Sequence, residues 1–354
     1  MAPPTTQYAV QSIEQGVAKL ISGTPVPKLR DDYILVKTVA VALNPTDWKH
    51  VDYLPTPGAI VGCDYAGVVE EVGPAVTKLF KRGDRVAGAV HGSNASQLDG
   101  GAFAEYIVAK GDGQIRIPDN VTFEEAATLG IGITTVGQGL YQSLGLQLPS
   151  SPTETRLPIL IYGGSTATGT LAIQFAKLSG YTVVTTCSPR NFELVKSLGA
   201  DAAFDYNDPN CAAEIRKFTS NRLFYVFDCI SSDVTGAICA NAIGPAGGKY
   251  SGLLIPKPKL PRGDVENLVT FAYTGLGEGF VKAGKSFPPV PEDYEFQKHF
   301  WALTEGLLRD GKFKVHPLHV GEEGLKGVLE GMQSMREDKV SGKKLVYRVA
   351  ETPK

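Results

Sequence analysis

The stretch YGGSTATGTLAIQFAKLSGY, residues 162–181, decides the fold of this chain. It follows the apolar run LPILI at 157–161 and precedes a second apolar run, TVVTTC, at 182–187. Its apolar residues recur at helical spacing, and Gly180 ends the helix. A glycine-rich turn between strand and helix lets the backbone approach a pyrophosphate, which the free N–H groups of the helix then bind. We therefore predict a dinucleotide-binding loop, with a structural turn as the alternative, because Thr166–Thr168 stand where more glycine is usual.

The end of the second strand indicates which cofactor binds. An NAD site usually has an acidic residue there to accept a bond from the ribose 2′-OH, whereas this chain has CSPRN at 187–191. A hydroxyl and a guanidinium suit a 2′-phosphate, so the cofactor is predicted to be NADPH. A surface arginine that caps a turn is the alternative. The cofactor residues expected from the loop and this strand are Gly163, Gly164, Ser165, Thr166, Ala167, Thr168, Ser188, Pro189, Arg190 and Asn191.

The order of strands and helices predicts an α/β protein of two domains. Short strands and helices alternate after residue 157, which is typical of a doubly wound parallel sheet, a Rossmann domain, over 134–299. A β-rich domain is expected from 1–133 and 300–354. Its expected strands and helices are strands at 33–43, 62–73, 81–90, 101–110 and 343–349, a helix capped by Thr122, and a long amphipathic helix at 294–313.

Composition limits the class of protein. The 354 residues fit about two domains, and a net charge of −2 gives no basic surface for nucleic acid. The five cysteines form no CxxC pair, which favours a reducing compartment. The N-terminal MAPPTTQYAV lacks a signal-peptide pattern, and no apolar run approaches the ~20 residues of a membrane span. We expect a soluble cytoplasmic protein.

Six motifs in order then resemble a known family. They are NPTDWK (44–49), GCDYAGVVEEVG (62–73), GDRVAG (83–88), GAFAEY (101–106), EEAATLG (124–130) and GGSTATG (163–169). Their order and spacing resemble the zinc-free quinone- and enoyl-reductase branch of the medium-chain dehydrogenase/reductases. Within it, CSPRNFELVKSLGADAAFDY and VSGKKLVYR look similar to fungal trans-acting enoyl reductases, which work beside highly reducing polyketide synthases. The resemblance implies a GroES-like catalytic domain joined to a Rossmann domain, with the active site in the cleft.

Whether the protein binds a metal ion is a separate question from its family resemblance. Zinc-dependent members carry a four-cysteine lobe, but the corresponding stretch here, HGSNASQLDGG at 91–101, has no cysteine. Cys63 falls where zinc enzymes often have histidine, with His50 and His91 nearby in sequence, and a lone cysteine cannot complete a tetrahedral site. We expect no metal and interpret Cys63 as a small buried thiol, with a Cys63-centred site as the alternative.

The resemblance implies that Lys49 and Thr135 are catalytic. Lys49 closes NPTDWK and is expected to hold the cofactor, donate to the developing enolate, or both; a solvated lysine on a turn is the alternative. Asp47 either orients Lys49 or caps the turn after Pro45. Thr46, Asp47 and Trp48 would lie beside the cofactor.

The remaining site residues are less constrained by the sequence. Thr134 and Thr135 either bond the thioester or carboxamide or cap a helix start, and the family often has proline at Gly130. Tyr206 follows the third strand, where adenine usually rests. Further cofactor residues are Leu253, Leu254 and, by resemblance only, Val340 and Ser341; the substrate residues are Thr134, Thr135, Val136, Gly137, Thr274, Gly275, Leu276, Gly277 and Glu278.

Three functions remain open. The first is an NADPH-dependent enoyl reductase that acts on a polyketide carried by the acyl carrier protein of a polyketide synthase. The second is a quinone or enone reductase of free small molecules. The third is an NADPH-binding partner protein without turnover. No nucleic-acid or membrane partner is expected, and the resemblance favours a monomer.

Overall fold

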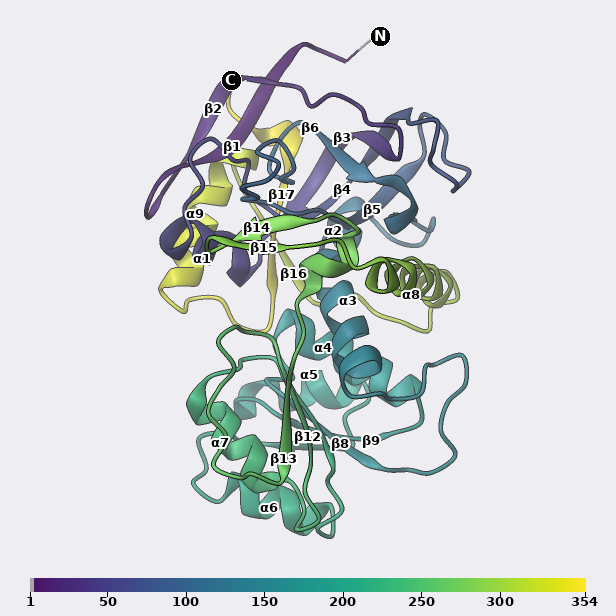
Figure 1. Cartoon of the computed structure of the whole chain (residues 1–354), viewed down its shortest axis with the longest axis vertical. Coiled ribbons are helices and arrows are strands. Elements are labelled where there is room, and N and C mark those ends of the chain that lie inside the picture. The colour runs from purple at the N-terminus through teal and green to yellow at the C-terminus, as the bar shows by residue number, and fades with distance from the viewer. Residues whose placement is uncertain (1–2) are drawn as a thin grey trace. The chain divides into compact units, whose positions relative to one another are not determined.

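The computed structural model describes residues 3–354, so the first two residues of the N-terminal stretch, where no signal peptide is expected, lie outside it. The described residues form two compact units (Figure 1). The parallel-sheet unit is Thr135–Ala272, and the β-rich unit comprises the described residues through Thr134 together with Tyr273–Lys354. The expected return to the β-rich domain at residue 300 is wrong, because the chain returns at Tyr273, whose ring stacks on His91.

The parallel-sheet unit has the strand order β10-β9-β8-β11-β12-β13, and every pairing is parallel. The chain runs outward from β8 in both directions, which confirms the Rossmann arrangement and places its switch point between β8 and β11. All five residues of β8 are buried, as expected for a strand covered on both faces. The strands are β8 (Pro158–Tyr162), β9 (Thr182–Thr186), β10 (Ala202–Phe204), β11 (Tyr225–Asp228), β12 (Gly248–Gly252) and β13 (Val265–Val269).

The helices of this unit follow the predicted alternation. The helix expected after the glycine-rich loop is α4, in which eight of twelve residues are buried. The helices are α4 (Ala167–Leu178), α5 (Phe192–Ser197), α6 (Cys211–Phe218) and α7 (Asp233–Ala242). Before them, α3 (Gly130–Val136) continues as a π-helical segment, Gly137–Ser143.

The β-rich unit is built on a mixed sheet of order β16-β17-β3-β4-β5-β7, with β6 paired to β3. The predicted C-terminal strand is β17, which pairs antiparallel with β3. The strand predicted at 101–110 begins only at Tyr106, because Ala104 makes an isolated bridge to Ala9 instead. The strands are β1 (Thr6–Glu14), β2 (Val17–Pro25), β3 (Tyr33–Ala42), β4 (Asp64–Val72), β5 (Arg85–Ala89), β6 (Tyr106–Lys110), β7 (Ile115–Arg116), β14 (Phe280–Lys282), β15 (Lys285–Phe287), β16 (Leu318–Gly321) and β17 (Lys344–Arg348).

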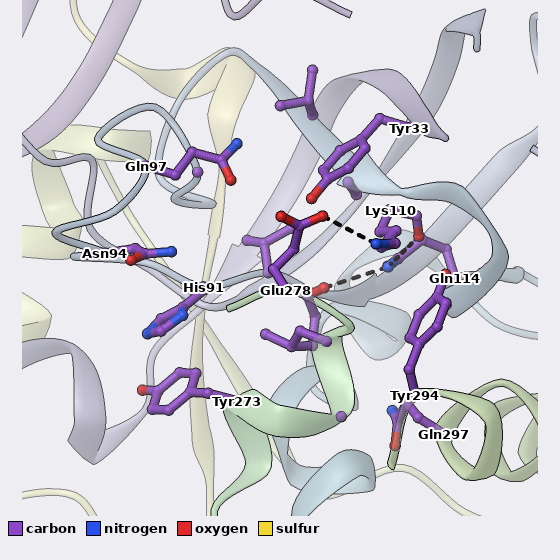
Figure 2. A pocket seen from close by; sticks show the side chains of 18 of the residues that line it. Tyr33, His91, Asn94, Gln97, Lys110, Gln114, Tyr273, Glu278, Tyr294 and Gln297 are labelled. Carbon is purple, nitrogen blue, oxygen red and sulfur yellow. Dashed lines mark hydrogen bonds and ion pairs between the residues drawn. The ribbon is translucent and has the colours of Figure 1, made fainter. Parts of the chain in front are cut away.

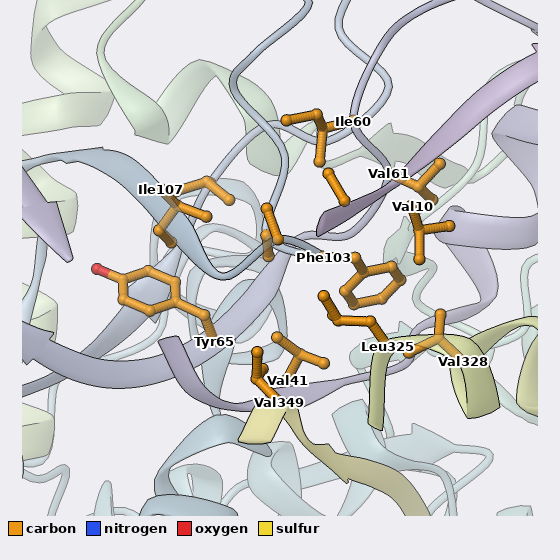
Figure 3. Packing of buried hydrophobic residues seen from close by; sticks show 14 of the residues in the cluster. Val10, Val41, Ile60, Val61, Tyr65, Phe103, Ile107, Leu325, Val328 and Val349 are labelled. Carbon is orange, nitrogen blue, oxygen red and sulfur yellow. The ribbon is translucent and has the colours of Figure 1, made fainter. Parts of the chain in front are cut away.

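The core of the β-rich unit joins segments from both ends of the chain. Figure 3 shows Phe103 packed among side chains of β1, β3 and the C-terminal helix α9. Gly62, with φ +98°, permits this packing, since a Cβ there would lie 2.3 Å from the Phe103 ring. The helices are α1 (Pro45–Tyr53), α2 (Phe123–Ala127), α8 (Pro291–Arg309) and α9 (Gly324–Arg336).

Two helices of this unit bear on the predictions. The helix predicted at Thr122 is α2, and Thr122 and Glu125 form its capping box. The turn predicted after Pro45 is wrong: Pro45 is the first residue of α1, where its fixed φ suits a helix start. In residues 3–354, no helix combines the length and apolar character that a membrane span requires.

Candidate functional site

The predicted dinucleotide loop lies at the carboxyl end of β8 and is tied to β9. The N–H of Gly163 donates to Thr186 Oγ1 at 3.1 Å, and the N–H of Gly164 donates to the Thr186 carbonyl at 2.8 Å. Thr166 is the N-cap of α4: its Oγ1 accepts from the N–H of Gly169 at 2.9 Å and donates to the Gly163 carbonyl at 2.8 Å. The Thr166 hydroxyl therefore fixes the conformation of the loop and caps the N-terminus of α4 next to the turn.

The glycines of the loop are required by close packing. A Cβ on Gly164 would lie 1.9 Å from Thr185 Oγ1, and a Cβ on Gly169 would lie 2.3 Å from the Gly163 carbonyl oxygen. Gly163 has φ +78°, a conformation that favours glycine. A tight turn that leads to the N-terminus of a twelve-residue helix fits a pyrophosphate, so these residues fit a dinucleotide.

Gly164→Ala is therefore expected to weaken dinucleotide binding by roughly tenfold or more, because relief of the clash must move β9 or the loop. Titration of cofactor fluorescence measures this. Gly263→Ala is the matched control in the same unit, since nothing lies within 4 Å of a Cβ there. Equal affinities for the two variants would contradict the assignment of the loop.

The residues predicted to select the cofactor gather at the ends of β9 and β10. Ser188 Oγ and Tyr206 Oη lie 3.0 Å apart, although eighteen residues separate them in the chain. Arg190 is exposed in the short 3₁₀ turn Pro189–Asn191, and the Tyr206 ring is 39% exposed. Leu253, directly after β12, donates its N–H to Ser231 Oγ at 2.7 Å. Ser188 and Tyr206 thus lie side by side, with the tyrosine partly exposed.

In the β-rich unit, α1 presents the NPTDWK residues. Asp47 Oδ2 accepts the N–H of Asn44 at 2.6 Å in a capping box, and burial raises the pKa of Asp47 to about 8. Of the two roles open to Asp47, the structure supports the cap. Lys49 lies within the helix and is half-buried, with Nζ 5.7 Å from the ring centroid of Trp48. Burial lowers the pKa of Lys49, and the charge of Asp338 opposes that shift.

Thr46 belongs to a cluster of polar side chains that the sequence did not predict. We call Thr46, His50, Tyr273 and Lys282 the Thr46 cluster. Thr46 Oγ1 lies 2.7 Å from Tyr273 Oη and 3.0 Å from His50 Nδ1, and Lys282 Nζ contacts His50 Nε2. Lys282 also lies 4.3 Å from the centroid of the Tyr273 ring. The spacing of Thr46 and His50, four residues apart, is a signal that could have found this pair, but nothing in the sequence links Lys282 to them.

Cys63 is the buried thiol that the sequence favours. Burial raises its pKa well above the ordinary value, with the carboxylates of Asp47 and Asp64 acting in the same direction. Among residues 3–354, no three His, Cys, Asp or Glu side chains are grouped so that they could hold a metal ion.

The glycine-rich segment predicted to meet the substrate lines part of a pocket within the β-rich unit (Figure 2). Gly275, Leu276 and Glu278 line it beside Tyr33 and Tyr294. Lys110 Nζ pairs with Glu278 at 3.0 Å and with Asp32 at 3.1 Å, and it donates to the Gly277 carbonyl at 3.1 Å. Thr274 instead donates to Asp293. The segment is thus held by ion pairs.

Thr134 and Thr135, at the predicted start of the Rossmann domain, lie inside α3, so their interpretation as helix caps is wrong. Thr134 is fully buried, and its Oγ1 accepts from Gln297 Nε2 at 2.6 Å. Thr135 follows it, with Val136 and Gly137 at the change to π-helical structure. Gly130 is explained by packing, since a Cβ there would lie 2.0 Å from Asp64 Oδ1.

The predicted cofactor residues thus fall in both units. Thr46, Asp47, Trp48 and Lys49 come together on α1, and the loop and ribose-edge residues come together in the parallel-sheet unit. Val340 and Ser341 follow α9, where Val340 packs against the core of the β-rich unit.

Comparison with known proteins decides the family. The model for the alcohol dehydrogenase GroES-like domain matches residues 30–119, and that for zinc-binding dehydrogenase matches 167–252. Trans-enoyl reductase TOXD of Cochliobolus carbonum is 57% identical over 296 residues, which cover 84% of this chain and 99% of TOXD. The chain belongs to the trans-enoyl reductase family.

Other members of the trans-enoyl reductase family match along nearly the whole chain. Trans-enoyl reductase ACTTS2 of Alternaria alternata is 51% identical over 97% of this chain and 99% of its own. The crystal structure of the CurK enoyl reductase superposes with a TM-score of 0.74, covering 97% of this chain and 99% of that one. At 18% identity, that likeness shows the fold alone. This trans-enoyl reductase is a medium-chain dehydrogenase, a family that binds a nicotinamide cofactor, and it is an oxidoreductase.

Proposed function

We propose that this trans-enoyl reductase reduces the α,β-unsaturated thioester of a polyketide intermediate carried by the acyl carrier protein of a polyketide synthase. NADPH is the proposed reductant, and the enzyme acts as a monomer beside the synthase. The observation that carries the proposal is Lys49, a half-buried cation on a helix that Asn44 and Asp47 cap. The names of the relatives support the same reaction.

The residues divide into those that hold the cofactor and those that stabilise charge. Residues 163–168 hold the pyrophosphate at the start of α4, and Ser188 and Arg190 hold the 2′-phosphate. When bound, the reduced nicotinamide supplies a hydride to the β-carbon of the substrate. Negative charge then develops on the thioester oxygen, where the Lys49 ammonium donates a hydrogen bond. A charged donor in a partly buried site stabilises that charge more strongly than water does.

Arg190→Ala is expected to raise the Kd for NADPH roughly 10–100-fold and to leave the Kd for NADH nearly unchanged. The reason is that a charge-assisted bond to phosphate contributes about 1.5–3 kcal/mol, and NADH has no 2′-phosphate to lose. Isothermal titration with each cofactor measures this. Arg222→Ala, an exposed arginine of the same unit, is the control. An equal loss of affinity for both cofactors would overturn the assignment.

The reaction is tested with an enoyl thioester on a pantetheine arm, with NADPH oxidation followed by absorbance and the product identified by mass. Formation of the saturated thioester, faster than the reduction of free quinones, is the expected result. Faster quinone reduction would favour a free small-molecule reductase instead. Binding of NADPH without turnover of either substrate, even with the carrier protein supplied, would favour a non-catalytic partner protein.

A further inference from the structure

Three side chains of the Thr46 cluster, each able to exchange a proton, contact one another in a continuous row. Thr46 and His50 stand one helical turn apart on α1, with Oγ1 and Nδ1 at 3.0 Å. Lys282, at the end of β14, contacts the other ring nitrogen, Nε2. The row therefore spans one imidazole ring, with a hydroxyl at one end and an ammonium at the other.

The direction of the hydrogen bonds follows from the acceptors. His50 Nδ1 lies 2.7 Å from the backbone carbonyl of Thr46, which can only accept, so Nδ1 carries the hydrogen. Burial, together with the charge of Lys282, lowers the pKa of His50 to about 4, so the ring is neutral at pH 7. Nε2 is then an acceptor and receives a hydrogen bond from the Lys282 ammonium. Donation thus runs from Lys282 to His50 and from His50 to the Thr46 carbonyl, with Thr46 Oγ1 3.0 Å from the same ring nitrogen.

The two ends of the row differ from its middle in exposure. His50 is 6% exposed, whereas Thr46 and Lys282 are both only half-buried. Burial lowers the pKa of Lys282 to about 8, so this amine releases and regains a proton near neutral pH. A buried imidazole between two partly exposed groups is an arrangement that suits proton transfer.

Tyr273 holds the hydroxyl end in place. Its Oη lies 2.7 Å from Thr46 Oγ1, and its ring stacks on His91 with centroids 3.9 Å apart. Burial, with the nearby Cys63 and Asp47, raises the pKa of Tyr273 well above its ordinary value. Tyr273 is therefore a positioning residue for Thr46.

We propose that Lys282, His50 and Thr46 form a relay that delivers the proton to the α-carbon of the reduced substrate. This inference rests on the proposed enoyl reduction, in which hydride addition at the β-carbon leaves an electron pair shared between the α-carbon and the thioester oxygen. The Thr46 hydroxyl gives its proton to the α-carbon, forming the new C–H bond, and takes the Nδ1 proton of His50. His50 Nε2 takes a proton from the Lys282 ammonium, and water reprotonates the Lys282 amine. This leaves the hydrogen of His50 on Nε2, so Nε2 must return its proton and Nδ1 must regain one from solvent before the next turnover.

Substitution of Lys282 tests the relay with the least disturbance to the fold. Lys282→Met is expected to lower kcat by roughly 10²-fold, the usual range for loss of a general acid, and to raise the solvent deuterium isotope effect on kcat. Lys282→Arg keeps the charge and a donor, but arginine does not release its proton, so it should behave like Lys282→Met. Lys285→Met is the matched control, because Lys285 is exposed and pairs with Lys282 across the same hairpin. Wild-type kcat and isotope effect in Lys282→Arg would overturn the relay.

A second measurement needs neither substrate nor cofactor. Nitrogen NMR of histidine-labelled protein, assigned with His50→Asn, is expected to show a neutral His50 with hydrogen on Nδ1. A His50 protonated on Nε2 would contradict the direction of the relay. Failure of wild-type enzyme to reduce the enoyl thioester would count against the proposed function, whereas wild-type turnover with unaltered Lys282 variants would count against the relay alone.

Discussion

Replacing Lys49 by alanine is expected to lower kcat for the enoyl thioester roughly 10²–10³-fold, the loss usually seen when one donor to a developing oxyanion is removed. The Kd for NADPH should change by no more than a few-fold, since the phosphates are held elsewhere. The lowered pKa of Lys49 supports this role, because a partly desolvated ammonium interacts more strongly with charge that develops beside it. Single-turnover kinetics and cofactor titration separate the two effects.

The control for Lys49 is another lysine of the same unit. Lys28 is exposed, and Lys28→Ala should leave both kcat and cofactor affinity unchanged. If Lys49→Ala retained wild-type kcat, Lys49 would be the solvated lysine of the alternative interpretation. A large loss of NADPH affinity with kcat preserved at saturation would make Lys49 a cofactor ligand only.

The parallel-sheet unit was the part of the fold most fully predictable from sequence. Its strand, glycine turn and helix are local features, and the packing of Gly164 against Thr185 shows why that turn permits so little variation. The start of α1 was also predictable from the sequence, since Asn44 followed by Pro45 is a helix-start signal. The prediction of a turn is wrong because a proline at the first helical position starts a helix and does not break one.

The return of the chain at Tyr273 was not predictable in the same way. The segment that follows is rich in glycine, and its place is fixed by contacts far along the chain: Tyr273 on His91 and Glu278 on Lys110. The same reason hides the Thr46 cluster, because Lys282 and His50 are 232 residues apart. Local patterns predict elements, whereas these contacts depend on tertiary packing alone.

The most deeply buried ion pair of the β-rich unit joins the elements that carry its site residues. Lys344 on β17 is 2% exposed at its side chain and pairs with the fully buried Asp64 on β4. Lys344 Nζ also donates to Asn44 Oδ1 at 3.0 Å and to the Thr128 carbonyl at 3.1 Å. Asp64 Oδ1 accepts the N–H of Ile131 at 2.6 Å. One cation and one carboxylate thus connect the ends of α1, α2 and α3.

Lys344→Met is expected to lower the free energy of unfolding of the β-rich unit by about 3–5 kcal/mol, because it leaves Asp64 buried without a countercharge. The double variant Lys344→Met with Asp64→Leu should recover most of that loss, since no charge then remains buried. Urea unfolding followed by tryptophan fluorescence isolates this unit, as both tryptophans of the sequence, Trp48 and Trp301, belong to it.

The comparison for this ion pair is Lys326 with Glu323, 3.0 Å apart and both about half exposed. Lys326→Met should cost no more than about 1 kcal/mol, because water already solvates both charges. If Lys344→Met lowered the free energy of unfolding as little as Lys326→Met, the Asp64 carboxyl would be either hydrated or protonated in the variant. The connection between α1 and β17 would then not depend on charge. A large loss that the double variant fails to recover would instead show that the bonds of Lys344 to Asn44 and Thr128, rather than its charge, hold the start of α1 in place.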